Sequence, residues 1–309
     1  MSIQRIGRCA ALTLMLILCL SWTLVLAEGA SERGGLGNLG LTPEQLADLE
    51  HQVSGIEWIK DIQPDRVQNG SVKDWTFMVY LCGSDLGSSA KADMVEMAKS
   101  GFNEDEFNVV VYTGGSMDWG TEKIPVNQNG LFEVHNDMIK QVNEYLPDDM
   151  SMNATLMHFM KVATEKYPAE KFGLILWDHG GGPIVGICKD VLHGSDTMAI
   201  QALKTALENS PFAKKKLDFI GFDACLMASL EVGKTLQPFS KYMLASEESE
   251  PAFGWNYAFL GQIKGDTEVG EIGRKVVDTY FDFSEEAGRG TSTASKAASS
   301  TTPTAPPAS

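Results

Sequence analysis

Between Trp75 and Phe283 the chain alternates short apolar runs with stretches that repeat apolar residues at helical spacing. The apolar runs are rich in aromatic and β-branched residues and end at glycine or charged residues, which is typical of buried strands. Predicted strands cover 75–83, 107–115, 172–178, 217–225 and 241–248, and predicted helices cover 88–101, 152–168, 197–210, 226–237 and 271–283. Buried strands that alternate with helices predict βαβ units. We therefore expect an α/β fold, with a mainly parallel sheet covered by helices on both faces.

One stretch shows a different pattern. Residues 121–136 alternate polar and apolar side chains around the dipeptide Asn129-Gly130. Asn-Gly favours the tight turns that join two antiparallel strands. This stretch is therefore predicted to be a hairpin that turns at Asn129-Gly130.

Both ends of the chain depart from the alternating pattern. Residues 9–27 carry no charge and follow Arg5 and Arg8, as in a secretory signal peptide. The alternative is an uncleaved membrane anchor, because the stretch is near the length of a membrane span. We expect a signal peptide over 1–27, a linker or pro-segment over 28–70, a folded domain over 71–286 and, because Ser, Thr, Ala and Pro dominate it, a disordered tail over 287–309. The protein is thus expected to be secreted or on the cell surface, with membrane contact only if the signal segment stays uncleaved.

Composition narrows the class of function. The 309 residues have a formal net charge of -16, which argues against nucleic-acid binding, since phosphate contacts need clustered Lys and Arg. Cleavage of the signal segment leaves Cys82, Cys188 and Cys225, which are too few and odd in number for a disulfide framework. The cysteines and histidines lack the paired spacing of a structural zinc site. We expect no metal and no cofactor, while a need for calcium stays open.

Two predicted strands end on residues that can do chemistry. WDHGGG (177–182) places His179 and three glycines after one strand, and FDAC (222–225) ends another on Cys225. Loops that follow parallel strands meet at one edge of the sheet, so these two residues can form a Cys–His nucleophilic pair. A predicted helix follows Cys225 directly, and a helix N-terminus favours the thiolate form of a cysteine. Taken singly, His179 can instead be a satisfied polar residue and Cys225 a small buried hydrophobe.

Three motifs together resemble those of the clostripain-like cysteine peptidases, in the caspase–legumain–gingipain clan. They are LILWDHGGG (174–182), DFIGFDACLMASLEV (218–232) and YMLASEESEPAFGWNY (242–257). The resemblance implies a caspase-like fold and a secreted cysteine endopeptidase that cuts peptide or protein substrates after Arg or Lys. Relatives continue into another strand after the last predicted helix, whereas this chain passes into the low-complexity tail. A non-catalytic surface or interaction protein that kept the fold is therefore the alternative.

The resemblance also implies the parts of the reaction centre. Cys225 would attack the peptide carbonyl as the thiolate, and His179 would protonate the leaving amine. The backbone N–H groups of Gly180 and Cys225 would form the oxyanion hole, because a glycine after the histidine lets bare backbone approach the substrate carbonyl.

Three further residues would contact the substrate. Asp223, two residues before Cys225, matches the family acid that holds a basic P1 side chain; the alternative is an acid that caps the next helix. The segment 246–251, which includes Glu247, lies where the family builds its substrate groove, and Trp255 would form a wall of that groove.

The resemblance implies one maturation step. The family is often cut by its own basic specificity between the histidine and the cysteine, here within 183–216. Lys189 lies early in this segment, in a glycine-containing stretch without clear periodicity, whereas the run 214–216 adjoins the next predicted strand. Stretches like the first are open to proteolysis. We expect a cut after Lys189 that leaves two associated chains; an uncut, active single chain is the alternative.

Overall fold

The computed structural model describes residues 55–62, 72–142, 144 and 146–299. The expected signal peptide (1–27), most of the expected linker (28–70) and the last ten residues of the expected tail lie outside these ranges. Within them, no helix combines the length and the apolar character that a membrane crossing requires.

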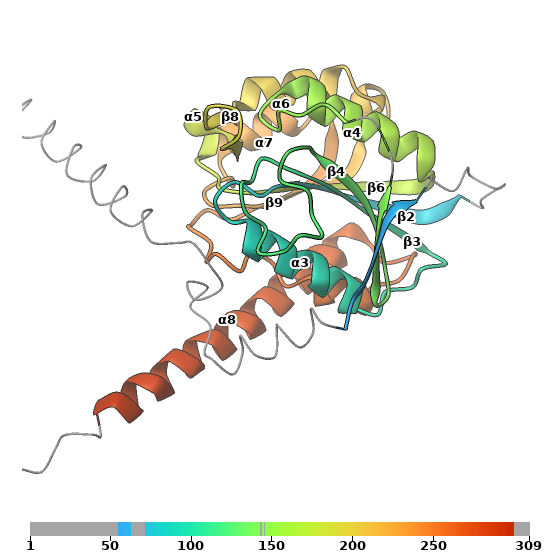
Figure 1. Ribbon diagram of the computed structural model, residues 1–309. Coiled ribbons are helices and arrows are strands. Elements are labelled where there is room, and N and C mark those ends of the chain that lie inside the picture. Colours follow the sequence, from blue (N-terminus) through green and yellow to red (C-terminus); the bar gives the residue numbers. More distant parts are fainter. Residues whose placement is uncertain (1–54, 63–71, 143, 145, 300–309) are drawn as a thin grey trace, which may run out of the picture.

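An eight-stranded sheet forms the middle layer of the molecule, with the strand order β1-β5-β4-β3-β2-β6-β9-β10 (Figure 1). β4 runs antiparallel to both its neighbours, and all other neighbouring strands are parallel. The strands are β1 (Glu57–Ile62), β2 (Lys73–Cys82), β3 (Phe107–Gly114), β4 (Gly130–His135), β5 (Met138–Val142), β6 (Ala169–Trp177), β9 (Leu217–Asp223) and β10 (Ser240–Leu244). A separate two-stranded sheet joins β7 (Ile187–Asp190) to β8 (Asp196–Met198).

Helices cover both faces of the large sheet (Figure 1). One face carries α4 (Asn153–Lys166), α6 (Ile200–Glu208), α7 (Leu230–Leu236) and the short η2 (Pro211–Ala213); the other carries α3 (Gly87–Lys99), η3 (Tyr257–Gln262) and α8 (Val269–Ser299). A single turn, α5 (Gly182–Val185), follows β6. Successive side chains of β2 alternate between two buried clusters, with Tyr80 in one and Val79 in the other. The mainly parallel α/β fold with helices on both faces is therefore confirmed.

The carboxyl ends of three central strands set the position of the candidate chemistry. Leu81 of β2 lies beside Trp177 of β6, and Trp177 lies beside Asp223 of β9. The chain therefore leaves β6 and β9 at the same level, and His179 and Cys225 each follow two residues later. Parallel pairing alone brings the two residues to one edge of the sheet.

The segment 28–70, expected to be a linker or pro-segment, includes Glu57–Ile62, which form the edge strand β1. This strand pairs with β5, and Trp58 packs edge-on against Phe132 with ring centroids 6.2 Å apart. The segment EWIKDI carries exposed Glu57 and Lys60. Charged residues of this kind are common on edge strands. They interrupt the continuous apolar run by which a buried strand is recognised in a sequence.

The predicted hairpin turns at a different place. The turn joins β4 to β5 at Asn136-Asp137, and Asp137 has a positive φ of 58°. Asn129 is instead buried, and its side-chain amide donates to the carbonyl of Pro147 at 2.8 Å. Asn and Asp both tolerate the left-handed conformation, so Asn136-Asp137 can replace Asn-Gly in the turn.

The last helix is longer than its predicted range, 271–283, because α8 continues to Ser299. The expectation of disorder from residue 287 is therefore wrong for 287–299. Buried Ile272 and Val276 anchor the first turns of α8 on the sheet. Once such a start exists, each added residue costs little, and the Ala, Lys and Arg of this segment favour helix.

Candidate active site

His179 and Cys225 line a small cavity of about 90 Å³ at the carboxyl edge of the sheet. Leu86, Asp223 and Glu250 also line it. The imidazole and the thiol are both half-buried. The juxtaposition predicted from the two strand ends is thus present in the structure.

Cys225 is the most accessible cysteine of the described residues. Cys82 and Cys188 are fully buried, and burial raises the pKa of both thiols well above the ordinary value. The sulfur of Cys225 instead lies at the cavity, where it accepts from the N–H of Glu250 at 3.2 Å and its S–H points to the carbonyl of Glu250 at 3.6 Å. A half-buried thiol that shares a cavity with an imidazole can act as a nucleophile, whereas the two fully buried thiols are inert.

The helix expected directly after Cys225 begins later. Residues 226–229 form a loop, and α7 starts at Leu230 with the Ser229 hydroxyl accepting from the N–H of Val232 at 3.2 Å. The argument that a helix N-terminus acts on the thiol is therefore wrong. Ser229 also fills the capping position, so Asp223 is not the cap of α7.

Gly180 holds the histidine loop against the cysteine loop. A Cβ atom at this position would lie 2.1 Å from the carbonyl oxygen of Cys225 and 3.1 Å from the Cβ of Ala224. The first contact is to backbone and is too close for any side chain, and the second is tight. The glycine is needed for close approach of the two backbone segments that carry His179 and Cys225.

Asp85 is a functional candidate that the motifs did not reveal. Its Oδ1 lies 2.8 Å from Nε2 of His179. The hydrogen bond from His179 holds the pKa of the Asp85 carboxyl well below its usual range, although burial opposes this. Burial lowers the pKa of His179, but the hydrogen bond to Asp85 and the charge of Asp178 outweigh it and raise the pKa above the ordinary value. Asp85 follows the strand 75–83, so the rule that reactive residues gather at strand ends could have found it.

Asp223 forms a buried acidic wall of the cavity. Its side chain accepts from the N–H of Trp255 and from the hydroxyl of Tyr257, each at 3.0 Å. Burial raises the pKa of Asp223 to about 7 in spite of these two donors. The carboxyl lacks a cation to balance its charge, since none of the ion pairs of the described residues includes it.

A second acid, Glu250, lies next to Asp223. Burial and the charge of Asp223 raise the pKa of Glu250 to about 8. One of its oxygens, Oε2, is buried without a hydrogen-bond partner. Glu247, predicted as the substrate residue of this loop, is exposed and does not line the cavity. The structure therefore places Glu250 where the sequence led us to expect Glu247.

Trp255 does not form a wall of the small cavity. It is 4% exposed and lines a neighbouring cleft of about 410 Å³ with Met243, Val276 and Tyr280. Glu250 borders both spaces. Ser246 of the segment 246–251 also lines that cleft, so the place of Trp255 in the substrate groove stays a prediction. The N–H of Trp255 donates to Asp223 at 3.0 Å.

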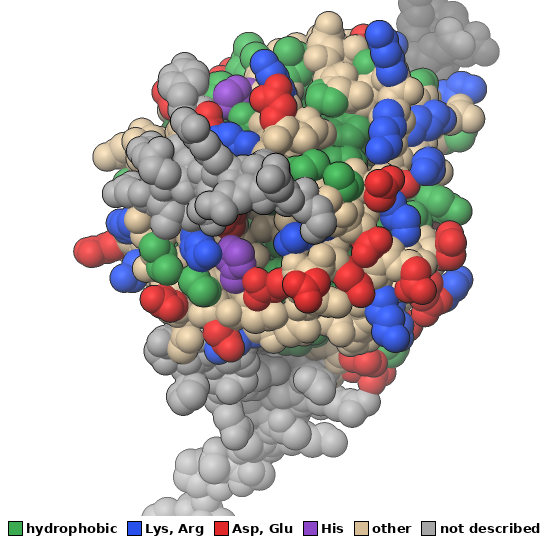
Figure 2. All heavy atoms as spheres, turned by 90° about the vertical axis from the view of Figure 1, so that its right-hand side faces the viewer, with side chains coloured by type: hydrophobic (Ala, Val, Ile, Leu, Met, Phe, Trp, Pro, Cys, Tyr) green, Lys and Arg blue, Asp and Glu red, His purple; other side chains and the backbone are tan. Residues whose placement is uncertain are grey.

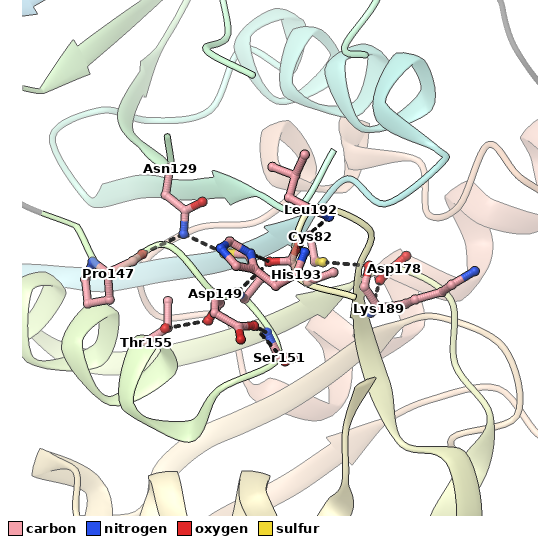
Figure 3. A network of polar contacts seen from close by, with 12 residues as sticks. Cys82, Asn129, Pro147, Asp149, Ser151, Thr155, Asp178, Lys189, Leu192 and His193 are labelled. Carbon is pink, nitrogen blue, oxygen red and sulfur yellow. Dashed lines mark hydrogen bonds and ion pairs between the residues drawn. The ribbon is translucent and has the colours of Figure 1, made fainter. Parts of the chain in front are cut away.

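Lys189, the predicted cleavage site, lies in β7 rather than in an open loop (Figure 3). Its N–H donates to Asp178, and its carbonyl accepts from the thiol of Cys82 at 3.4 Å. On either side of it, Cys188 and Asp190 are fully buried. A cut after Lys189 stays a prediction, and it requires β7 to detach first.

One group of described residues has the spacing of a metal site: Asp149, Asp190 and His193 (Figure 3). The carboxylate of Asp190 already accepts from the N–H groups of Met150, Leu192 and His193 and lies 3.0 Å from Nδ1 of His193. These contacts tie the segment before α4 to the turn after β7, which accounts for the arrangement without an ion. The expectation of no metal and no cofactor stays a prediction.

Comparisons with known proteins agree with the fold. A secreted C11 cysteine protease from Bacteroides thetaiotaomicron, solved with an irreversible peptide inhibitor, is 24% identical and superposes with a TM-score of 0.56. An inactive zymogen C11 protease from Parabacteroides distasonis is 25% identical, with a TM-score of 0.52. Both alignments cover 68% of this chain, which spans 58% and 59% of those two proteins. A search of curated proteins gave no match.

The sequence comparison covers most of the described domain. The model of the clostripain family matches residues 79–302, which include the loops of His179 and Cys225 and both acids of the cavity. The match extends over more than half of the chain. The protein therefore belongs to the clostripain family.

Proposed function

We propose that the protein is a secreted cysteine endopeptidase that hydrolyses peptide bonds after Arg or Lys. The observation that carries this proposal is the shared cavity, in which a half-buried thiol and imidazole stand beside the buried carboxyl of Asp223 and the half-buried carboxyl of Glu250, and no ion pair of the described residues includes either acid. Membership of the clostripain family supports the assignment as a cysteine peptidase, and the similarity to a secreted C11 protease supports secretion.

The proposed reaction uses the side chains of the cavity in two steps. The Cys225 thiolate attacks the carbonyl carbon of the substrate, and the carbonyl oxygen takes the negative charge. The N–H groups of Gly180 and Cys225 stabilise that oxygen, because Gly180 lets the two backbone segments come close. His179 gives a proton to the leaving amine as the C–N bond breaks, and water then hydrolyses the thioester and restores the thiol.

The acids of the cavity suit a basic P1 side chain. Each carboxyl holds its proton more tightly than usual because it is removed from water, and the charge of Asp223 adds to this effect at Glu250. An ammonium or guanidinium that enters the cavity can balance the charge that these protons now cancel. Guanidinium and carboxylate form a strong and directional pair, so Arg and Lys are favoured over neutral residues at P1.

A panel of peptides that differ only at P1 tests the proposal. We expect cleavage after Arg and Lys, and a loss of at least about 10³-fold in Cys225→Ala, since removing a nucleophile leaves only binding and oxyanion stabilisation. Cys188→Ala is the matched control, because it removes a thiol that lies outside the cavity. Undiminished hydrolysis by Cys225→Ala would contradict the mechanism.

Iodoacetamide labelling separates a live site from an inert fold. The active protein should react at Cys225 alone, as the other two thiols are buried. A folded protein whose Cys225 reacts no faster than an ordinary thiol, and which cleaves no peptide of the panel, would favour the non-catalytic alternative.

A further inference from the structure

The contact between His179 and Asp85 assigns the two ring nitrogens of the histidine. Nε2 lies 2.8 Å from the carboxylate of Asp85, and an ionised carboxylate can only accept hydrogen bonds. Nε2 must therefore carry a hydrogen in this arrangement. We propose that Asp85 is a positioning residue that keeps the hydrogen on Nε2, so that Nδ1 is the atom that gives the proton to the leaving amine. This inference rests on the proposed peptidase function.

The carboxylate of Asp85 is held in place before any substrate binds. The hydroxyl of Ser84 donates to the same Oδ1 at 3.0 Å, and Ser84 itself has a positive φ of 47°. The N–H of Leu86 donates to the carbonyl of Gly83 at 2.7 Å, which closes the turn around the acid. The turn leads directly into α3, whose N-terminus favours a negative charge.

Gly87 packs the loop that carries Asp85 closely against the neighbouring backbone. A Cβ atom at Gly87 would lie 2.0 Å from the carbonyl oxygen of Asp118, so backbone packs against backbone here. The N–H of Gly83 also donates to the carbonyl of Gly114 at 2.8 Å. Asp85 thus stands on a loop fixed at both ends, as a positioning residue requires.

The histidine side of the contact is fixed as well. Asp178 immediately precedes His179, is fully buried and accepts from the N–H of Lys189 in β7. The charged groups that act on the imidazole are Asp85 from the loop before α3, Asp178 from the end of β6 and Lys189 from β7, with the thiol of Cys225 across the cavity. The two carboxylates favour the imidazolium and the lysine opposes it, and the carboxylates prevail.

The fixed hydrogen on Nε2 serves both halves of the reaction. In the first half, the imidazolium donates the Nδ1 proton to the departing nitrogen while the C–N bond breaks, and the thioester remains on Cys225. The neutral ring then keeps its hydrogen on Nε2, because Asp85 still accepts it. The lone pair of Nδ1 is free to take a proton from the water that attacks the thioester. The return of that proton to Nδ1 restores the imidazolium as the acid is released.

The exposure of the pair separates catalysis from stability. Both side chains are 40% exposed, and surface pairs of this kind contribute little to folding. Loss of Asp85 should therefore leave the melting temperature nearly unchanged and act on the proton transfer. A residue with a purely structural role would show the reverse.

Asp85→Asn tests the inference through its pH profile. We expect kcat/KM to fall between about 10- and 100-fold, less than the whole effect of an acid–base catalyst, because the imidazole remains. The imidazolium is required for the first half, so activity falls as pH rises through the pKa of His179. Without the carboxylate that pKa falls, and we expect the alkaline limb to move to lower pH. Asp85→Glu should recover part of the loss.

Glu104→Gln is the matched control, because Glu104 makes the same 2.8 Å contact to His135 at the opposite edge of the sheet. This variant should keep the wild-type pH profile. An Asp85→Asn enzyme with a wild-type profile and rate would overturn the inference, even if its Tm changed.

Nitrogen NMR of histidine-labelled protein in the Cys225→Ala background gives a readout that needs no activity. We expect His179 to show the Nε2–H form when neutral, and to lose this preference and titrate at lower pH after Asp85→Asn. An unchanged tautomer and titration would refute the role of Asp85. If the wild type cleaves no peptide but His179 responds in this way, the proposed function fails while the pairing stands.

Discussion

The carboxyl edge and the amino edge of the central sheet each carry a histidine that lies 2.8 Å from a carboxylate oxygen. The two edges differ in whether their buried acids have a charged partner within the protein. The carboxyl edge has His179 and Asp85 beside the cavity of Cys225. The amino edge has His135 and Glu104 beside a cavity of about 250 Å³. Figure 2 shows this second edge as a face where a hollow opens beside a histidine, with lysine and acidic side chains around it.

At the amino edge the acids are compensated within the protein. Glu104 lies 2.8 Å and Glu133 lies 3.5 Å from the two ring nitrogens of His135. Burial acts to raise the pKa of both acids, but hydrogen bonds from His135 and other donors outweigh it, and both pKa values are lowered. The pKa of His135 is raised in turn, chiefly by Glu133. The charges of this edge are therefore balanced without a ligand.

At the carboxyl edge two acids are left uncompensated. Burial raises the pKa of Asp223 to about 7 and that of Glu250 to about 8, and the described ion pairs include neither. The contrast shows that a histidine with a carboxylate is not by itself the mark of a functional site. What indicates a functional site is a group of acids without a cationic partner in the protein, because a bound cation can then balance their charge.

The largest expected effect follows from removing that charge. Asp223→Ala should lower kcat/KM for peptides with Arg or Lys at P1 by about 10²- to 10³-fold, as loss of one partner of a buried charge pair does. Peptides with a neutral P1 should lose far less. Glu133→Gln, an acid of the amino edge, is the control and should leave both substrate classes unaffected. Equal losses for basic and neutral peptides would assign Asp223 to structure.

Substitution of Glu250 should have a smaller effect on P1 selectivity, which can be measured as a function of pH. An acid must be ionised to pair with a cation, so the ratio of cleavage after Arg to cleavage after Gln should rise from pH 6 to pH 8 in the wild type, across the pKa values of about 7 and about 8. The ratio cancels the titrations of the thiol and the imidazole. Glu250→Gln should lower it by about tenfold at pH 8, as for one charged hydrogen bond.

The outcome that breaks this prediction is simple. A ratio that stays constant from pH 6 to pH 8 would mean that the acids of the cavity do not meet the P1 side chain. Glu247→Gln is the matched variant, three residues away on the same loop and exposed, and it should behave as the wild type.

The fold and the meeting of His179 and Cys225 at one edge of the sheet were predictable because they depend on local rules. Strand periodicity placed β6 and β9, and parallel pairing brought His179 and Cys225 to one edge whatever lies between them in the chain. The loops were not predictable in this way. Which acid of 246–251 turns inward depends on tertiary hydrogen bonds, such as that from the N–H of Leu226 to the carbonyl of Glu248 at 3.1 Å.

The acid that contacts His179 could not be predicted because it lies far from the histidine along the chain. Asp85 meets His179 across 94 positions, and no motif of the sequence joins them. The predictions for the two ends of the chain failed for another reason. A composition poor in apolar residues argues against a packed core, but it is compatible with a strand at a sheet edge or with a helix that continues from a packed first turn. β1 and the extension of α8 are both of this kind.

Protein stability should show the same contrast between the edges. Asp223 and Glu250 have folded-state pKa values above those of the unfolded chain, so the stability that they contribute is complete below about pH 4 and is lost as pH rises through about 7 and 8. We expect the Tm of the wild type to fall by a few degrees between pH 5 and pH 8, and Glu250→Gln to reduce this fall. Glu104, whose pKa is lowered, should lose its contribution at the acid end instead. A Tm slope that Glu250→Gln leaves unchanged between pH 5 and pH 8 would contradict the assignment.

The smallest expected effect concerns the cut after Lys189. Its N–H is bound by Asp178 and its carbonyl by Cys82, so a protease must first release β7 from the domain. Asp178→Ala removes one of these anchors, and in the Cys225→Ala background, where self-cleavage is absent, trypsin should cut after Lys189 a few times faster than in Cys225→Ala alone. The exposed lysines at 214–216 provide an internal control and should be cut at the same rate in both proteins. If intact-mass analysis shows equal rates at Lys189 as well, β7 opens without regard to Asp178, and the link between the histidine loop and this strand does not protect the site.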